Sequence, residues 1–152
     1  MATVSRVIDA DPAAVFSVLA NGWAYGQWVV GTSHVRAVDS DWPARGSKLH
    51  HAVGAWPLVL RDHTEVKESA PGRRLLLLAR GWPFGEAEVD LTLEAEGAGT
   101  RVQIREEPVG GPGWLLRNPV GDALIHRRNV ECLARLAALV ERRTVPPEEA
   151  SA

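Results

Sequence analysis

Three ionisable side chains interrupt stretches of sequence that are otherwise apolar. Asp62 lies between Leu60 and Val66 in an alternating stretch. Glu106 ends a second alternating stretch, and His126 precedes the apolar stripe of a long helical segment. A carboxylate or an imidazole in an apolar pocket has a shifted pKa and can donate or accept a proton. We therefore treat His126, Glu106 and Asp62 as candidate general acids or bases.

The same residues have an equally physical structural interpretation. Strand ends rise out of a core, so Glu106 could lie in water at the mouth of a cavity. Asp62 could pair with an arginine of a neighbouring strand. A bulge near a strand end reverses which face each side chain occupies. The sequence leaves both alternatives open.

The sequence contains no complete metal or phosphate site. His50 and His51 are adjacent, and adjacent side chains on a strand point to opposite faces. Asp122 precedes His126 by one helical turn, but two groups fall short of the three or four ligands of a zinc site. The glycine-rich stretch 110–113 lacks the lysine of a phosphate-binding loop. We therefore expect no metal and no cofactor.

Tryptophan dominates the aromatic residues, with six tryptophans against one tyrosine and two phenylalanines. A tryptophan suits a ligand pocket or its lid, because it brings a large apolar surface and one N–H donor. It suits a core plug beneath a loop equally well. The number of tryptophans favours a pocket-lining role for some of them, and the candidates are Trp28, Trp56, Trp82 and Trp114.

A long helix near the end of the chain is the clearest element of the sequence. Between Pro119 and Arg143 only Gly121 disfavours a helix after the proline, and proline suits a first turn. At about 1.5 Å per residue, a helix of roughly 22 residues is about 33 Å long and needs an equally long apolar surface. Its predicted buried stripe contains Val130, Leu133, Leu136, Ala137 and Val140, and its predicted ligand-facing residues are His126, Asn129, Val130 and Leu133.

An antiparallel sheet is predicted to supply that surface. Residues 3–9 form a first strand, and Asp11–Pro12 opens a short helix that ends near Ala20. A second helical turn follows at 23–28. Strand-length stretches with short turns then predict a meander, and a loop rich in proline and glycine at 108–113 leads to the helix. These strands are predicted at 34–40, 47–53, 58–68, 74–80, 86–96 and 100–107.

Composition limits the possible functions. The chain has 152 residues, is 45% hydrophobic and carries a net charge of −2, which fits one globular domain and gives no electrostatic reason to expect nucleic acid. We expect a domain at 1–143 with a disordered tail at 144–152. The single cysteine, Cys132, is interpreted as a structural thiol. No signal peptide or membrane-spanning run is evident, so we expect a cytosolic monomer or homodimer without membrane insertion.

The N-terminal segment and the order of elements resemble a known family. The segment Ala10-Asp11-Pro12-Ala13-Ala14-Val15-Phe16, followed by a tryptophan, a meander and a long terminal helix, is similar to the START/birch-pollen-allergen (SRPBCC) superfamily. The polyketide cyclase/dehydrase-like branch is the most similar. The resemblance implies an α+β helix-grip fold, in which a curved antiparallel sheet of six to seven strands encloses an apolar cavity with the helix. It implies binding of lipids, sterols or polyketides, and only some members are enzymes.

Two functions lead, and a third remains open. The first is a cytosolic protein that binds a small hydrophobic ligand, lipid-, polyketide- or aromatic-like, without chemistry. The second is a cyclase or dehydratase that uses general acid–base catalysis. The third is an interaction module that binds no ligand. We expect a cavity of several hundred Å³, with its mouth near Trp56, Trp82 and Trp114. A polar cavity floor favours the enzyme and an apolar floor the carrier.

Overall fold

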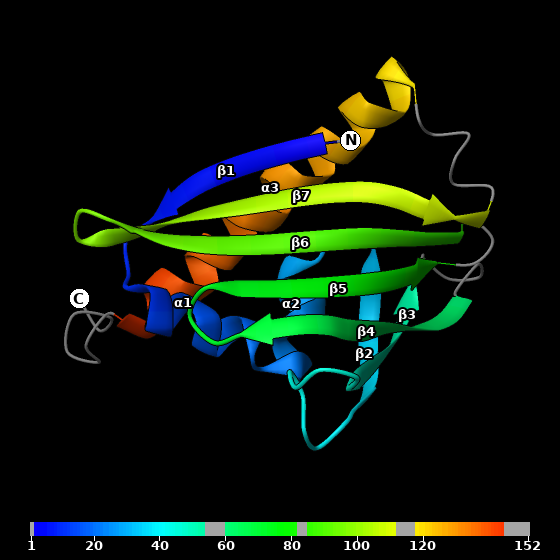
Figure 1. Cartoon of the computed structure of the whole chain (residues 1–152), viewed down its shortest axis with the longest axis horizontal. Helices are drawn as coiled ribbons and strands as arrows, with labels where there is room; N and C mark the ends of the chain where they lie inside the picture. The colour runs from blue at the N-terminus through cyan, green and yellow to red at the C-terminus, as the bar shows by residue number, and fades with distance from the viewer. Residues whose placement is uncertain (1, 54–59, 82–84, 112–117, 145–152) are drawn as a thin grey trace.

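The computed structural model of the protein describes residues 2–53, 60–81, 85–111 and 118–144. One antiparallel sheet curves around a long helix, and shorter helical segments lie beside that helix (Figure 1). The helical elements are α1 (Pro12–Leu19), the 3-10 helix η1 (Gly22–Ala24), α2 (Tyr25–Trp28) and α3 (Pro119–Thr144). The strands are β1 (Ala2–Ile8), β2 (Thr32–Val38), β3 (Lys48–Val53), β4 (Leu60–Ala70), β5 (Arg74–Gly81), β6 (Gly85–Glu96) and β7 (Gly99–Gly110).

The sheet has seven strands in the order β1-β7-β6-β5-β4-β3-β2, and every neighbouring pair is antiparallel. Strands β2 to β7 therefore form a meander, and β1 joins it through β7, where Val4 pairs with Ile104. This arrangement confirms the α+β helix-grip class predicted from the sequence. Short turns explain it, because two adjacent strands joined by a short turn can only pair antiparallel.

Strand β7 is longer than the sequence predicts. The loop expected to begin at Pro108 begins later, because β7 continues to Gly110, with Pro108 opposite Ala87 and Gly110 opposite Glu86. A register shift between Glu86 and Ala87 lies beside the proline. Proline lacks an N–H for the ladder and is tolerated in a strand at such an irregularity.

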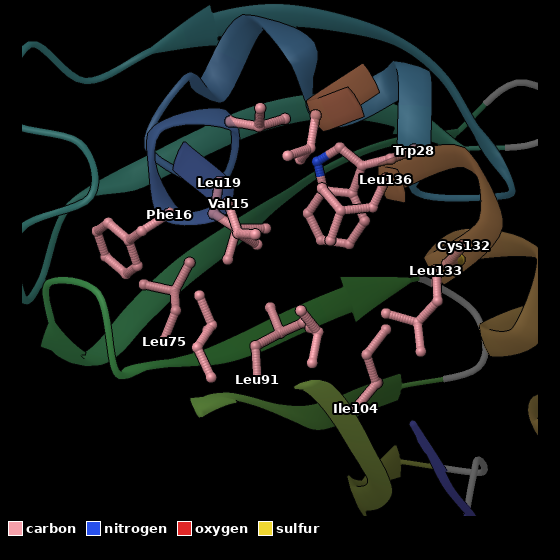
Figure 2. Packing of buried hydrophobic residues seen from close by; sticks show 14 of the residues in the cluster. Val15, Phe16, Leu19, Trp28, Leu75, Leu91, Ile104, Cys132, Leu133 and Leu136 are labelled. Atoms are coloured by element: carbon pink, nitrogen blue, oxygen red, sulfur yellow. The ribbon is translucent and has the colours of Figure 1, made fainter. Parts of the chain in front are cut away.

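Helix α1 begins as predicted. The Asp11 carboxylate accepts a hydrogen bond of 2.7 Å from the Ala14 backbone N–H, and Pro12 occupies the first turn. Its buried side chains join one hydrophobic core with α3 and the concave face of the sheet (Figure 2). The core contains Val15, Phe16 and Leu19 from α1, Leu133 and Leu136 from α3, and Leu75, Leu91 and Ile104 from the sheet.

The buried face of α3 is rotated relative to the predicted stripe. Leu133, Leu136, Ala137 and Val140 are buried as predicted, but Val130 is 45% exposed and that part of the prediction is wrong. At about 100° per residue, Val130 lies at the margin of the face centred on the buried residues. Asn129 and Cys132 take its place on that face.

The first turns of α3 extend past the edge strand β1 (Figure 1). Leu124 is accordingly 61% exposed, and His126 is exposed as well. Among the described residues, none of the helices combines the length and the apolar character that crossing a membrane requires.

Candidate functional site

A small cavity lies between the sheet, α2 and α3. Its volume is about 30 Å³, enough for one or two water molecules. Most of its wall is apolar, and its polar residues come from α2, β7 and α3. The lining residues are Tyr25, Trp28, Val29, Leu77, Ala79, Val89, Ile104, Glu106, Arg128, Asn129 and Cys132.

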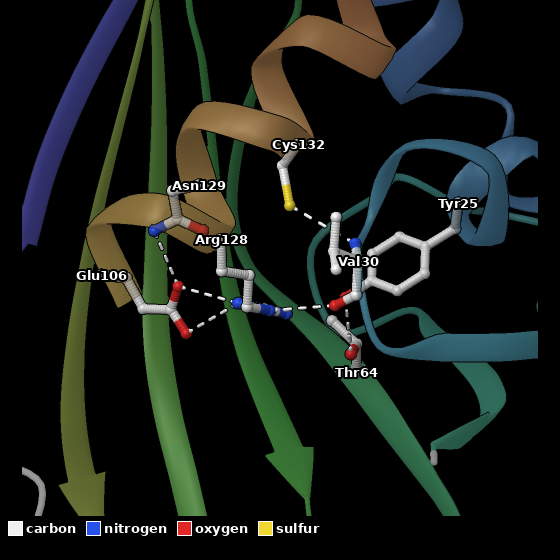
Figure 3. A network of polar contacts seen from close by, with 7 residues as sticks. All are labelled: Tyr25, Val30, Thr64, Glu106, Arg128, Asn129 and Cys132. Atoms are coloured by element: carbon white, nitrogen blue, oxygen red, sulfur yellow. Dashed lines mark hydrogen bonds and ion pairs between the residues drawn. The ribbon is translucent and has the colours of Figure 1, made fainter. Parts of the chain in front are cut away.

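One side of the cavity is a partly buried ionic network, in which Glu106 is buried and the Arg128 side chain is 38% exposed (Figure 3). Glu106, on β7, is only 8% exposed. Arg128 Nη1 donates to both of its oxygens, at 3.3 and 3.1 Å, and Asn129 Nδ2 donates to Oε2 at 2.9 Å. Three donated hydrogen bonds to two oxygens match an ionised carboxylate, which only accepts. Adjacent residues of α3 thus hold one carboxylate of the sheet.

The same helix holds the backbone that follows α2. Arg128 Nε donates to the Val30 carbonyl at 2.9 Å, and the Val30 N–H donates to Cys132 Sγ at 3.4 Å (Figure 3). Arg128 and Cys132 are four residues apart, so both side chains lie on one side of the helix. Arg128 therefore links the sheet, α3 and the segment after α2 around the cavity.

A second group of polar side chains begins at the cavity wall and continues into the sheet. The Tyr25 hydroxyl lies 3.4 Å from Thr64 Oγ1, and Thr64 Oγ1 lies 2.9 Å from His51 Nε2. The Tyr25 ring also stacks on the His51 ring, with centroids 5.8 Å apart. Tyr25, Thr64 and His51 are all buried. Together they form a continuous chain of hydrogen-bonding groups.

Burial sets the protonation state of these groups. It lowers the pKa of His51 to about 4, partly opposed by the nearby Asp62 carboxylate, so the imidazole is neutral at pH 7. It raises the pKa of the Tyr25 hydroxyl and of the Cys132 thiol, because the charged forms lose hydration. His51 Nδ1 is buried without a hydrogen-bond partner in the described part of the chain.

The three predicted catalytic residues do not lie together in one site. Glu106 lines the cavity, as predicted from its apolar strand. Asp62 is partly buried beside His51 and accepts a hydrogen bond from the His63 N–H, but it does not line this cavity. His126 is exposed on α3. A role for these residues in catalysis stays a prediction, and of the three only Glu106 lines this cavity.

Only some of the predicted ligand-binding residues lie at the cavity or in the adjoining core. Asn129 lines the cavity, Leu133 is buried in the adjoining core, and Val130 and His126 point to solvent. Trp28 is 4% exposed and lines the wall. The remaining candidates, Trp56, Trp82 and Trp114, lie outside the described residues. The predicted cavity of several hundred Å³ extended to that region, so its full size stays a prediction.

Sequence reasoning missed Tyr25, Arg128 and His51. At about 100° per residue, helical periodicity places the backbone of Arg128 far from the centre of the buried face of α3. Its long side chain reaches round the helix to Glu106. Tyr25, the single tyrosine, lies in a short helix whose orientation no periodicity reveals. His51 was considered only as a metal ligand. Within the described ranges, no three histidine, cysteine or acidic side chains form a group that could hold a metal ion.

Several solved structures share the fold at low sequence identity. NE0264 from Nitrosomonas europaea has 16% identity and a TM-score of 0.72, with 93% of this chain and 94% of that chain covered. TTHA0849 from Thermus thermophilus has 20% identity and a TM-score of 0.69, with 95% and 99% covered. The di-domain ARO/CYC StfQ from the steffimycin biosynthetic pathway has 10% identity and a TM-score of 0.70, with 93% and 50% covered.

These identities show a common fold and no more. No match was found among curated proteins. A family model does match, over residues 1–141, and its description is polyketide cyclase/dehydrase and lipid transport. The seven-stranded sheet with its long helix is the helix-grip architecture expected from the sequence. Because the family model covers nearly the whole chain, the chain belongs to the polyketide cyclase/dehydrase and lipid-transport family.

Proposed function

We propose that this protein binds a small, largely apolar molecule between the sheet and α3, and that it does so without chemistry. The observation that carries the proposal is the composition of the cavity wall. Apolar side chains from β5, β6, β7 and α2 surround one polar side, made by Glu106, Arg128 and Asn129. A pocket of this kind holds an apolar body by burial and orients it by a few polar contacts.

The described cavity is small for a ligand. Its 30 Å³ compares with about 300 Å³ or more for typical small-molecule sites. A ring-sized ligand therefore has to displace side chains or extend beyond this part of the wall. The proposal requires that the polar end of the ligand reaches the Arg128 side.

A neutral fluorescent probe tests the proposal. N-phenyl-1-naphthylamine should gain fluorescence on binding the native protein, and it should quench tryptophan emission because Trp28 lines the cavity. Ala79→Leu adds three carbons to the wall, in space that the probe needs, and should weaken probe binding about tenfold or more, which corresponds to at least about 1.4 kcal/mol.

Ala138→Leu is the matched control for this measurement. It makes the same substitution at an exposed position of α3 and should leave the affinity unchanged. Thermal melts should show that both variants are folded. A native protein that does not bind the probe, or equal affinities for both variants, would contradict binding at this cavity.

The second candidate function is a dehydratase, and the buried Tyr25–Thr64–His51 chain favours it. In such a reaction the Glu106 carboxylate would take the proton next to a ketone, and the Tyr25 hydroxyl would protonate the departing hydroxyl group. Water and a conjugated ketone are the products. To complete the cycle, Glu106 releases the proton that it gained and Tyr25 regains one, both by exchange with water. Thr64 and His51 hold the Tyr25 hydroxyl in place through hydrogen bonds and ring stacking.

The dehydratase is tested with a β-hydroxy ketone such as 4-hydroxy-4-phenylbutan-2-one. Its dehydration product absorbs in the near ultraviolet, so turnover is followed directly. Tyr25→Phe should retain binding but lower the rate about 100-fold or more, as expected for loss of a general acid. His126→Ala should have no effect, because His126 is exposed. Binding of this ketone by the native protein without water loss would favour the carrier.

A further inference from the structure

Arg128 retains one nitrogen, Nη2, that is not occupied by the described residues. A guanidinium has five N–H donors. In Arg128, Nε is taken by the Val30 carbonyl and Nη1 by Glu106. Nη2 makes no hydrogen bond to the residues that the structure describes. Since Arg128 lines the cavity, Nη2 is the donor that it can offer to an acceptor oxygen of a ligand.

The charges around this donor sum to zero. Arg128 contributes one positive charge, and Glu106 contributes one negative charge 3.1 Å away. Tyr25 and Cys132, whose pKa values are raised by burial, stay neutral. The remaining lining residues carry no ionisable group. A neutral ligand leaves this balance undisturbed, whereas a carboxylate adds a second negative charge beside Glu106.

We propose that Glu106 determines the charge selectivity of the cavity: by neutralising Arg128, it admits neutral ligands with a hydrogen-bond acceptor and excludes carboxylates. The inference rests on the proposed binding function. In a partly buried site, two like charges a few ångströms apart repel each other much more strongly than in water. The same arginine without Glu106 would be an unpaired, partly buried cation, and it would favour a carboxylate.

Two nearly isosteric probes measure this selectivity. 2-Acetylnaphthalene and 2-naphthoate share their ring system and one carbonyl, and differ by a methyl group in place of a charged oxygen. Their dissociation constants should be measured at pH 7 by ligand-observed NMR or calorimetry. The native protein should bind the ketone about tenfold or more tightly than the carboxylate.

Glu106→Gln should shift that preference toward the carboxylate by at least about tenfold. The change is close to isosteric, and the amide oxygen can take the place of Oε2, which accepts from both Arg128 and Asn129. Glu107→Gln is the matched control. It removes the same charge from the neighbouring position of β7, where the alternation of a strand directs the side chain to the opposite face. Glu107→Gln should keep the native preference.

The outcomes separate the two proposals. If the native protein binds the ketone but binds the carboxylate equally tightly or more tightly, the proposed selectivity is wrong. This result does not depend on whether Glu106→Gln folds. A preference that changes equally in Glu106→Gln and Glu107→Gln also overturns it, since that would be a long-range charge effect. If neither probe binds the native protein, Glu106→Gln or Glu107→Gln, the proposed binding function is wrong, and the proposed selectivity is then wrong as well.

Discussion

Leu133→Ala should destabilise the protein by about 2–5 kcal/mol, the usual range for a large-to-small change in a core. Leu133 is 1% exposed and lies midway along α3, in the core shared with the sheet (Figure 2). Removing its side-chain carbons loses buried apolar surface and leaves a void that the surrounding side chains can only partly fill. Urea melts at pH 7 would measure the loss.

Glu131→Ala is the control for that experiment. Glu131 lies on the exposed side of α3 and its carboxylate pairs with Arg135 at 2.9 Å one turn later. Exposed pairs of this kind contribute about 0.3–0.5 kcal/mol, so this variant should be nearly as stable as the native protein. If Leu133→Ala lowers the free energy of unfolding by less than about 1 kcal/mol, the helix does not pack tightly against the sheet at Leu133.

Lowering the pH from 6.5 to 4 should remove roughly 3 kcal/mol of stability through His51 alone. Its pKa falls from the ordinary 6.5 to about 4 in the folded protein, mainly because burial disfavours the charged ring. The unfolded chain therefore takes up this proton first as the pH falls. The stabilisation is complete above pH 6.5 and is lost progressively down to pH 4.

Other charges near His51 modify this shift without reversing it. Asp62 raises the pKa of His51, whereas His63, Arg36 and His50 lower it further. Carboxylates elsewhere also titrate at the acidic end of this range, so the stability of the native protein alone does not isolate His51. A comparison of variants removes their contribution.

The measurement is the difference in pH dependence between the native protein and His51→Gln. Urea melts between pH 7 and pH 4 should show a loss roughly 3 kcal/mol smaller in the variant. Its absolute stability will also fall, because the stacking of His51 on Tyr25 is lost. His34→Gln, at an exposed position of β2, should retain the native pH dependence. Parallel curves for native protein and His51→Gln would show that His51 titrates normally.

The polar side of the cavity bears on the choice between carrier and enzyme. A polar floor was expected to favour an enzyme, and Glu106 with Arg128 and Asn129 is such a floor. These groups are, however, already bonded to one another. A carboxylate committed to an arginine is better suited to setting charge and position than to moving protons. This is why we place ligand binding first and dehydration second.

The sequence alone determined the order of elements and the outline of the fold. The Asp11–Pro12 start of α1 and the alternation that buries Leu91, Leu93, Val102 and Ile104 are local patterns, so they could be recognised without a structure. Glu106 could be placed on the concave face for the same reason, because it continues the alternation of β7. Leu133 followed from helical periodicity.

The tertiary structure alone decided which polar groups meet. Periodicity specifies where a side chain leaves the backbone, and it does not specify how far a long side chain reaches or where a helix overhangs its sheet. Arg128 therefore reaches Glu106 at the cavity from a backbone position far from the centre of the buried face, whereas the His126 side chain is exposed. Tyr25, Thr64 and His51 come from α2, β4 and β3. The pairing of β3 with β4 brings Thr64 and His51 together, and only the tertiary packing of α2 places Tyr25 against them.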